Sequence, residues 1–184
     1  MAIHIICGRL GSYKSCIAVA FAYAIQSYLG YDIKANFNIH GMTERLTCYE
    51  DVLNSLGAVL ILDETEIFAN SRDSAKPDNK ALKHFQLISR KQFLEPIFIA
   101  PRLGSIDVNI RDMADFTHVM QIDGQNVIQS IYERPMIGED YVLLGQNVFN
   151  KERFVPFFKW YDTTEKPSNF LKGASKYNDI TDDL

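Results

Sequence analysis

The first forty residues combine short apolar runs with one long apolar stretch. Ile3–Cys7 is a short apolar run that stops at Gly8, and a small loop follows. Residues Lys14–Leu29 are apolar on almost every helical face, as in a helix buried against a sheet, and Gly30 stands at the C-cap position. These segments predict a strand, a loop and a helix, in that order. Tyr31–Ile39 predicts a second strand.

The next two segments differ in their apolar spacing. Thr43–Leu56 is more polar, and its apolar residues recur at i, i+3 and i+4, which predicts a surface helix. Ala58–Leu62 is a run of consecutive apolar residues that ends at Asp63 and Glu64. Such a run predicts a central parallel strand, buried on both faces, with an acidic pair at its carboxyl end.

From residue 71 to residue 122 the chain alternates between polar and apolar segments. We expect a loop, a helix, a buried strand, a loop, a short helix and a strand at Ser71–Asn79, Lys80–Lys91, Pro96–Ala100, Pro101–Ser105, Ile106–Met113 and Thr117–Ile122. Strands that alternate with helices, each strand a continuous apolar run, predict an α/β fold with a mainly parallel central sheet flanked by helices. Ligands bind such sheets at the carboxyl ends of the strands.

The C-terminal part has a different pattern. Two alternating segments, Val127–Arg134 and Tyr141–Phe149, flank a turn rich in proline and glycine and predict an antiparallel hairpin. From Thr163 onward the chain is polar, with few large apolar residues. We therefore expect one domain over residues 1–165 and an extended or disordered tail over residues 166–184.

Composition narrows the class of protein. The 184 residues are 47% apolar and carry a formal charge of −4, which suits one soluble domain without a global attraction for nucleic acid, so DNA contact would need a local basic patch or a ring of subunits. The longest apolar run, Ile17–Ile25, is too short to span a bilayer, and we expect no secretory leader. The odd cysteine count, Cys7, Cys16 and Cys48, favours reduced thiols in a cytosolic setting.

The loop after the first strand is the strongest chemical motif. The P-loop pattern is G-x-x-x-x-G-K-[ST]; Gly8, Lys14 and Ser15 match it, and Tyr13 replaces the second glycine. Lys14 can reach the β- and γ-phosphates of a nucleotide, and the Ser15 hydroxyl can bind Mg²⁺. A tyrosine resists positive φ, and Gly11 could supply part of that torsion. The residues expected to bind nucleotide are Gly8, Gly11, Ser12, Tyr13, Lys14 and Ser15. An ordinary strand-to-helix turn with Lys14 in solvent also accounts for the segment.

The acidic pair has the form of a Walker B motif. Asp63 is expected to hold the Mg²⁺ shell, and Glu64 to orient or deprotonate the attacking water. Taken alone, the pair also suits a loop or a helix cap. Its strand is expected to neighbour the first strand, and the two motifs together favour a site for a Mg²⁺-nucleotide.

Three arginines follow or precede predicted strands. Arg102 comes after Pro101, at the place where many P-loop motors carry a sensor of the γ-phosphate, and its guanidinium can pair with phosphate oxygens. Arg90 or Arg111 could act on the nucleotide of a neighbouring subunit as an arginine finger. For any one of them taken singly, an ordinary surface ion pair is the better interpretation.

In this order the motifs resemble the zonula occludens toxin-like family of phage assembly ATPases, relatives of the FtsK–HerA group of DNA-pumping motors. The matching segments span about residues 2–165 and are Gly8–Ser15, Asn36–Ile39, Leu60–Glu64, Ser89–Arg90, Ile106–Asp107 with Arg111, and Trp160–Glu165. The resemblance implies a RecA-like P-loop NTPase fold, with ATP and Mg²⁺ as cofactors. It also implies that Lys14 and Ser15 bind phosphate and Mg²⁺, that Asp63 supports the metal and Glu64 activates water, and that Arg90 or Arg111 serves a neighbouring site.

The same resemblance implies a biological role. We expect a viral ATPase that forms a homo-oligomeric ring, with six subunits as the leading expectation. It would use ATP to translocate or package DNA during virion assembly, in the host cytoplasm or associated with the virion. Filamentous-phage members continue into a membrane-spanning helix; we expect none in this chain, and this difference favours packaging.

Two alternatives remain open. One is a filamentous-phage extrusion ATPase that acts with a separate membrane partner or another virion protein. The other is an assembly protein that keeps the fold without hydrolysing ATP, because Tyr13 stands in the P-loop and Pro101 stands where the family usually has a glutamine.

Overall fold

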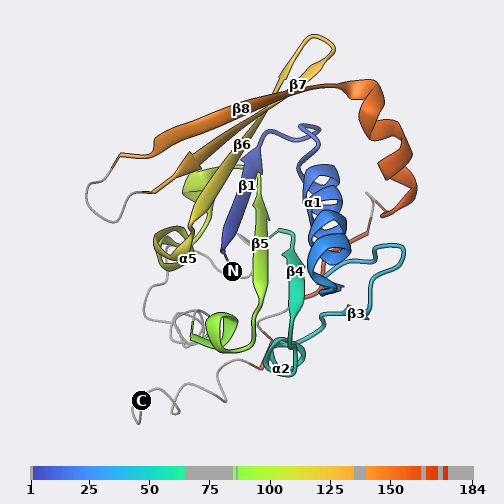
Figure 1. The fold of residues 1–184 in the computed structure, drawn as a ribbon, viewed down its shortest axis with the longest axis vertical. Helices are drawn as coiled ribbons and strands as arrows, with labels where there is room; N and C mark the ends of the chain where they lie inside the picture. The colour runs from blue at the N-terminus through green and yellow to red at the C-terminus, as the bar shows by residue number, and fades with distance from the viewer. Residues whose placement is uncertain are drawn as a thin grey trace.

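The computed structural model describes residues 2–64, 85, 87–134, 140–162, 165–169 and 172–173. The described residues form one eight-stranded sheet with helices on both faces (Figure 1). In chain order the elements are β1 His4–Gly8, α1 Lys14–Leu29, β2 Asp32–Ala35, β3 Glu44–Arg45, α2 Tyr49–Leu53, β4 Ala58–Leu62, β5 Glu95–Ala100, the 3₁₀ helix η1 Leu103–Ser105, α5 Val108–Met113, β6 Phe116–Asp123, β7 Asn126–Glu133, β8 Val142–Asn150 and the 3₁₀ helix η2 Lys151–Lys159. Residues 87–91 are also helical.

The sheet has the order β3-β2-β4-β5-β1-β6-β7-β8. Strands β3 to β6 in this order are parallel, and β7 and β8 extend the sheet as antiparallel strands. The predicted α/β fold with a mainly parallel sheet is therefore confirmed, and so is the hairpin of β7 and β8. An additional hairpin joins β6 to β7, with Gly124 at positive φ in the turn.

The expected pairing of the first strand with the strand before the acidic pair is wrong. β5 lies between them and pairs with both, with Cys7 opposite Ala100 and Leu62 opposite Phe98. The ends of β1 and β4 are therefore two strand spacings apart, about 9–10 Å. This separation leaves room between the loop after β1 and the acidic pair after β4.

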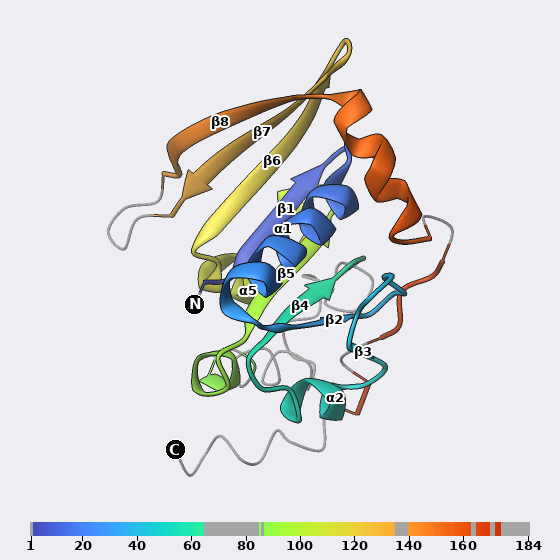
Figure 2. The ribbon, with the colours of Figure 1, turned by 45° about the vertical axis from the view of Figure 1, so that its right-hand side comes forward.

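Helix α1 matches its predicted bounds. It covers one face of the sheet, with Cys16, Ala18 and Ala22 buried against the strands (Figure 2). It ends at Gly30, whose φ of 71° is the left-handed conformation that glycine adopts without strain, and whose N–H donates to the Gln26 carbonyl. α2, residues 87–91 and α5 cover the opposite face. Among the described residues, no helix is both long enough and apolar enough to span a membrane.

The helix expected over Thr43–Leu56 is wrong in its first half. That half pairs with the open edge of β2 as β3, and the Leu46 N–H continues this pairing by donating to the Ala35 carbonyl. Only the second half is helical, and it begins where the Asp51 carboxylate accepts the backbone N–H of Cys48. The hydrogen bonds that β2 offers to this segment thus outweigh its helical apolar spacing. They depend on a strand distant in the chain, so the local pattern does not predict them.

Most other boundaries agree with the sequence. β5, α5 and β6 match their predicted segments, whereas β2 ends at Ala35, short of the expected Ile39. The loop expected at Ser71–Asn79 and most of the first part of the helix expected at Lys80–Lys91 lie outside the described residues. The described residues of the tail have no regular structure, and the boundary after residue 165 stays a prediction.

Two histidines form a buried pair between β1 and β6. His4 Nδ1 and His118 Nε2 are 3.1 Å apart, and Gln129 Nε2 lies 3.1 Å from His118 Nδ1. Because an amide nitrogen can only donate, His118 accepts at Nδ1 and donates from Nε2 to His4. Burial lowers the pKa of His4 to about 3, with a smaller contribution from His118, and burial lowers the pKa of His118 to about 4.

This pair predicts that the fold loses stability in acid. Below the ordinary pKa of 6.5, the unfolded chain binds protons that the folded chain excludes, so the free energy of unfolding falls as the pH falls from about 6.5 toward 4. At pH 5 each ring would cost up to about 2 kcal/mol. Urea unfolding at several pH values should show a shallower decline for His118→Gln than for the unaltered chain. Parallel curves would contradict this account.

Candidate active site at the ends of β1, β4 and β5

A cavity of about 580 Å³ lies at the carboxyl ends of the parallel strands. Four parts of the chain line it: the loop before α1 with the first turn of that helix, Phe37 after β2, the ends of β4 and β5, and the segment after β8. The main lining residues are Leu10–Ser15, Asp63, Glu64, Ala100, Pro101, Phe158, Tyr161, Asp162 and Glu165. The sequence analysis predicted a ligand site at these carboxyl ends of the strands, and the cavity volume is in the range of small-molecule sites.

Gly8 fixes the start of the loop. A Cβ atom at this position would collide with the Met120 carbonyl oxygen on β6 and would lie 2.6 Å from the Ser12 Oγ. Only glycine fits between the strand and the returning loop. The Ser12 N–H donates to the Arg9 carbonyl and closes the turn. The first P-loop glycine therefore has a steric role that the structure displays directly.

Tyr13 holds the conformation that the P-loop pattern assigns to a glycine. Its φ of 65° and ψ of 22° are left-handed, and Gly11 is also left-handed with φ of 76°, so Gly11 does not relieve Tyr13 of this torsion. A left-handed non-glycine residue costs about 1–2 kcal/mol. The Tyr13 ring packs against Phe154 and Phe158, with ring centroids 5.0 Å and 5.8 Å away. This aromatic packing offsets the backbone strain.

The structure brings the P-loop serine and the first acid together. Ser15 Oγ, in the first turn of α1, donates to Oδ2 of Asp63, which follows β4, over 2.9 Å. Lys14 Nζ donates to the Arg9 carbonyl over 2.9 Å, within the loop itself. Burial raises the pKa of the Asp63 carboxyl, and the Ser15 hydroxyl and the Lys14 charge oppose that rise. A buried carboxylate of this kind is stabilised by a nearby cation.

The donor set fits Mg²⁺ bound together with a nucleotide. Mg²⁺ usually takes one or two protein oxygens and completes its shell with water and phosphates, and Ser15 with Asp63 supplies that number. Among the described residues, no group of three or more His, Cys, Asp or Glu is placed to hold a metal without such help. The buried Ser12 Oγ has no hydrogen-bond partner among the described residues, which suits a loop that receives phosphate oxygens.

Glu64 lies beside the candidate metal ligands. It lines the cavity, and its φ of 54° turns the chain sharply at the end of β4. Its backbone N–H donates to Asp63 Oδ1 over 2.8 Å, which orients the neighbouring carboxylate. Both acids of the predicted Walker B pair therefore face the same cavity as Lys14 and Ser15.

Asn36 is a site residue to which the sequence analysis assigned no role. It is fully buried after β2; its Oδ1 accepts the Asp63 N–H over 2.9 Å, and its Nδ2 donates to the Asp63 carbonyl over 3.0 Å. Nδ2 also donates to the Ser168 carbonyl over 3.1 Å. The side chain thus extends the pairing of β2 and β4 by one step and positions Asp63. The available signal was a polar side chain inside the predicted strand Tyr31–Ile39, in the Asn36–Ile39 segment that the family resemblance includes.

Replacing Asn36 with leucine is expected to destabilise the fold and to weaken Mg²⁺-dependent nucleotide binding. The change keeps the side-chain volume but leaves the buried N–H and carbonyl of Asp63 without partners, at a cost of about 1–3 kcal/mol. Urea unfolding and Mg²⁺ titrations with a nucleotide would measure the two effects. The control is Asn54→Ala, at an exposed residue after α2. Equal midpoints for Asn36→Leu and the unaltered chain would refute the positioning role.

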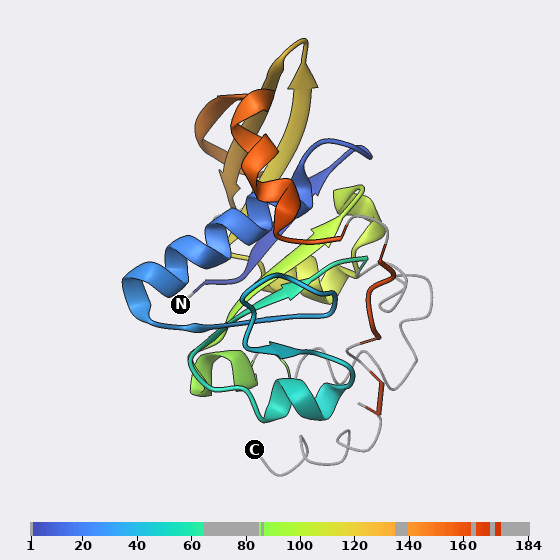
Figure 3. The same cartoon turned by 90° about the vertical axis from the view of Figure 1, so that its right-hand side faces the viewer.

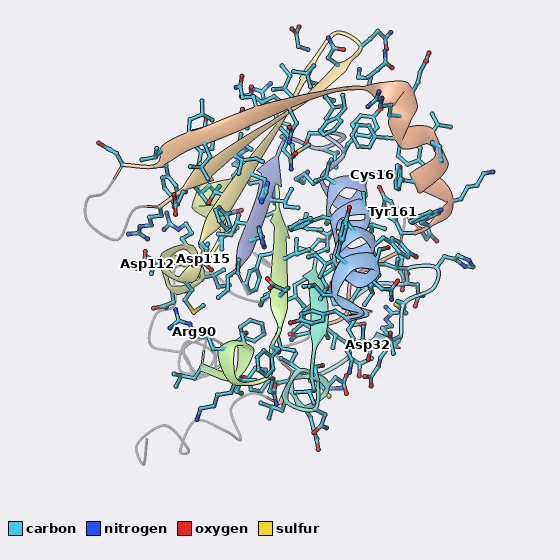
Figure 4. The ribbon with its side chains drawn as sticks, viewed as in Figure 1. Cys16, Asp32, Arg90, Asp112, Asp115 and Tyr161 are labelled. Atoms are coloured by element: carbon cyan, nitrogen blue, oxygen red, sulfur yellow. The ribbon has the colours of Figure 1, made fainter. Side chains whose placement is uncertain are left out.

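The three predicted arginines do not line the cavity. Arg102 is exposed before η1, and Pro101 occupies the wall beside it. Arg90 is exposed on the helical residues that precede β5. It therefore lies near the amino ends of the strands, opposite the cavity at their carboxyl ends (Figure 4). Arg111 lies on α5, and its Nε is buried without a hydrogen-bond partner among the described residues. The positions of these arginines therefore assign none of them to the cavity lining.

The aromatic segment after β8 closes another wall of the cavity. η2 packs against both α1 and β8 (Figure 3). The ring of Trp160, which follows η2, lies 4.2 Å from the Tyr23 ring on α1. Tyr161 donates from its hydroxyl to Cys16 Sγ over 3.2 Å, and Figure 4 shows both near the start of α1. Burial raises the pKa of Tyr161 well above its ordinary value. The tyrosine therefore stays protonated and serves as a donor.

Solved structures of other proteins resemble the fold of this chain. No family model matches the sequence, and no curated protein matches it. The N-terminal domain of zonular occludens toxin from Neisseria meningitidis is 15% identical, with a TM-score of 0.56 over 88% of this chain and 98% of that one. The genome packaging NTPase B204 of Sulfolobus turreted icosahedral virus 2, in complex with sulfate, is 13% identical, with a TM-score of 0.54 over 72% and 90%. A KaiC-like protein from the hyperthermophilic archaeon Pyrococcus horikoshii is 10% identical, with a TM-score of 0.51 over 81% and 85%.

These likenesses confirm the expected fold class. The chain has the α/β fold of P-loop NTPases, with a RecA-like, mainly parallel central sheet. The resemblance inferred from the motifs is thus confirmed at the level of the fold, which the chain shares with the zonular occludens toxin domain and with a viral packaging NTPase.

Proposed function

We propose that this chain is a P-loop ATPase that binds Mg²⁺-ATP in the cavity and hydrolyses it. The observation that carries the proposal is the hydrogen bond from Ser15 to Asp63 in the wall of a cavity that Lys14 also lines. It joins the two halves of a nucleotide site that lie far apart in sequence. The P-loop fold of the neighbours supports the same conclusion.

Each residue has a defined task in this proposal. The amides at the start of α1, together with Ser12, bind phosphate oxygens, and Lys14 places its charge at the β- and γ-phosphates. Ser15 and Asp63 would hold Mg²⁺, which would supply positive charge to neutralise the phosphates. Glu64 orients the attacking water and accepts its proton.

For the biological role we propose DNA translocation in viral genome packaging. The likeness to a structure described as a genome packaging NTPase supports this role. A ring of copies, six by expectation, would bring Arg90 or Arg111 of one subunit to the cavity of the next, since neither lines its own. Arg102 is proposed as a further phosphate contact, the place of action is the host cytoplasm or the virion, and the partners are DNA and other assembly proteins.

A non-hydrolysing assembly protein is the second candidate. Tyr13 holds a strained conformation in the loop, and Pro101 occupies the cavity wall where a polar sensor is expected. Both features favour a site that binds nucleotide but turns it over poorly. The extrusion role is supported only by the likeness to zonular occludens toxin.

One experiment separates these roles. Phosphate release from Mg²⁺-ATP is measured for the purified chain alone, with double-stranded DNA and with single-stranded DNA. Stimulation by double-stranded DNA supports packaging. Hydrolysis without any response to DNA, combined with cofractionation with membranes, favours extrusion. Nucleotide binding without measurable hydrolysis identifies an assembly protein, and no binding at all refutes the proposal.

A further inference from the structure

The two edges of the sheet are built differently. β3 forms one edge and consists of two charged residues, Glu44 and Arg45. β8 forms the other edge and runs for nine residues, Val142–Asn150, of which none is charged and none is proline. Alternate residues of an edge strand direct their backbone N–H and C=O groups outward, and native proteins usually protect such edges with short strands, lysine or proline. β3 has this protection, whereas β8 has neither the short length nor the charges.

β8 also exposes large apolar side chains. Four of them are between 49% and 61% exposed: Val142, Leu143, Leu144 and Val148. A register shift relative to β7 lies beside Leu144 and leaves Gly145–Asn150 regularly paired. Figures 1 and 2 show β8 as the outermost strand, and no described strand pairs with its outer side. The strand therefore combines open backbone hydrogen-bonding groups with apolar side chains in solvent.

A strand of equal length is needed to pair with the whole of this edge. β3 of another copy could pair with only two residues of β8, so a head-to-tail contact between these edges would leave most of β8 open. A second β8 matches the full length. A two-fold axis perpendicular to the sheet, through the middle residue Gln146, aligns the two strands antiparallel. It places Leu144 of each copy opposite Val148 of the other, and Leu143 opposite Phe149.

We propose that β8 is a self-association surface, which pairs with β8 of a second copy in this register and joins the two sheets into one. Cross-strand apolar pairs stabilise such a contact. The two-fold axis sets the strand against an identical one, so a strand with net charge would repel its copy, and β8 carries no charge.

This contact differs from the one that the proposed ring requires. It is isologous, with the same residues on both sides, whereas a ring that brings an arginine of one subunit to the next cavity is heterologous and needs a separate surface. β8 itself does not line the cavity. The inference therefore stands independently of the proposed nucleotide site.

The test places charges at two positions that the register pairs. Leu144→Lys combined with Val148→Lys sets like charges opposite each other twice across the axis, and should weaken association about ten-fold or more. Leu144→Glu combined with Val148→Lys sets opposite charges at the same positions and should restore association. Sedimentation velocity over a range of protein concentrations measures the association. Hydrogen exchange of the β8 amides in the unaltered chain should slow as the concentration rises.

The matched control is Leu29→Lys combined with Leu56→Lys. These exposed leucines lie at the end of α1 and after α2, so the control adds the same charge away from β8 and should associate as the unaltered chain does. Thermal unfolding checks that every variant is folded. All samples are measured without nucleotide, and a separate titration with ATP tests the proposed function.

The outcomes decide both the surface and its register. A monomer at every concentration would overturn the inference, as would a lysine variant whose sedimenting mass equals that of the unaltered chain. Loss of association in the lysine variant without rescue by the glutamate–lysine pair would contradict the antiparallel pairing of residues 144 and 148. Loss that is rescued, with no change in the control, supports the inference.

Discussion

Lys14→Ala is expected to lower the rate of ATP hydrolysis about 100-fold or more and to weaken nucleotide binding. The side chain starts α1 and places the positive charge of the loop at the cavity wall, where phosphate charge must be stabilised. Its hydrogen bond to the Arg9 carbonyl keeps the ammonium over the loop. Phosphate release and equilibrium titration with ATP measure the two effects.

The matched control for this variant is Lys91→Ala. Lys91 is exposed on the helical residues that precede β5, near the amino ends of the strands, whereas the cavity lies at their carboxyl ends. The Lys91→Ala change removes the same charge away from the cavity, so this variant should bind and hydrolyse ATP as the unaltered chain does. If Lys14→Ala behaved like Lys91→Ala, the loop would be an ordinary turn and the site assignment would be wrong.

Glu64→Gln is expected to stop turnover while leaving ATP binding intact. Glutamine keeps the shape of the side chain but cannot accept the proton of the attacking water, and loss of a general base costs about 100-fold or more. Single-turnover hydrolysis should therefore fall steeply, while the dissociation constant for ATP stays within a few-fold. A variant that loses binding and hydrolysis together would instead assign Glu64 to the metal shell.

Glu165 provides a sharp control, because it lines the same cavity with a different set of contacts. Its carboxylate accepts hydrogen bonds from the backbone N–H and the side-chain amide of Asn38, both over 2.9 Å, and it pairs with Arg45. These contacts hold the segment around Glu165 against Asn38 and Arg45. Glu165→Gln should lower stability modestly and leave turnover per folded molecule unchanged, in contrast to Glu64→Gln.

The buried elements were predictable because their pattern is local. α1 and β4 match their expected bounds, since each is apolar on every side that packs and ends at a glycine or an acidic pair. β3 was missed because a two-residue strand exists only through its partner. The apolar spacing of Thr43–Leu56 is satisfied equally by a strand followed by a short helix, so periodicity could not separate the two.

The candidate site was predictable in its ionic part and not in its walls. Lys14, Ser15, Asp63 and Glu64 stand in motifs with fixed spacing, and the structure gathers them around one cavity. The insertion of β5 between β1 and β4 depends on strand order, which no local pattern encodes. The contact of Phe158 with Tyr13 likewise depends on how η2 returns over α1.

The tail has a practical consequence for any shortened version of the protein. Ser168 exchanges two hydrogen bonds with Asn36, and the Lys172 carbonyl accepts the N–H of Tyr49 at the start of α2. Trimming at residue 165, the boundary that composition suggests, would remove these contacts and expose the amide that steadies Asp63. Binding measured on such a fragment would then be that of a site in which Asp63 is held less firmly.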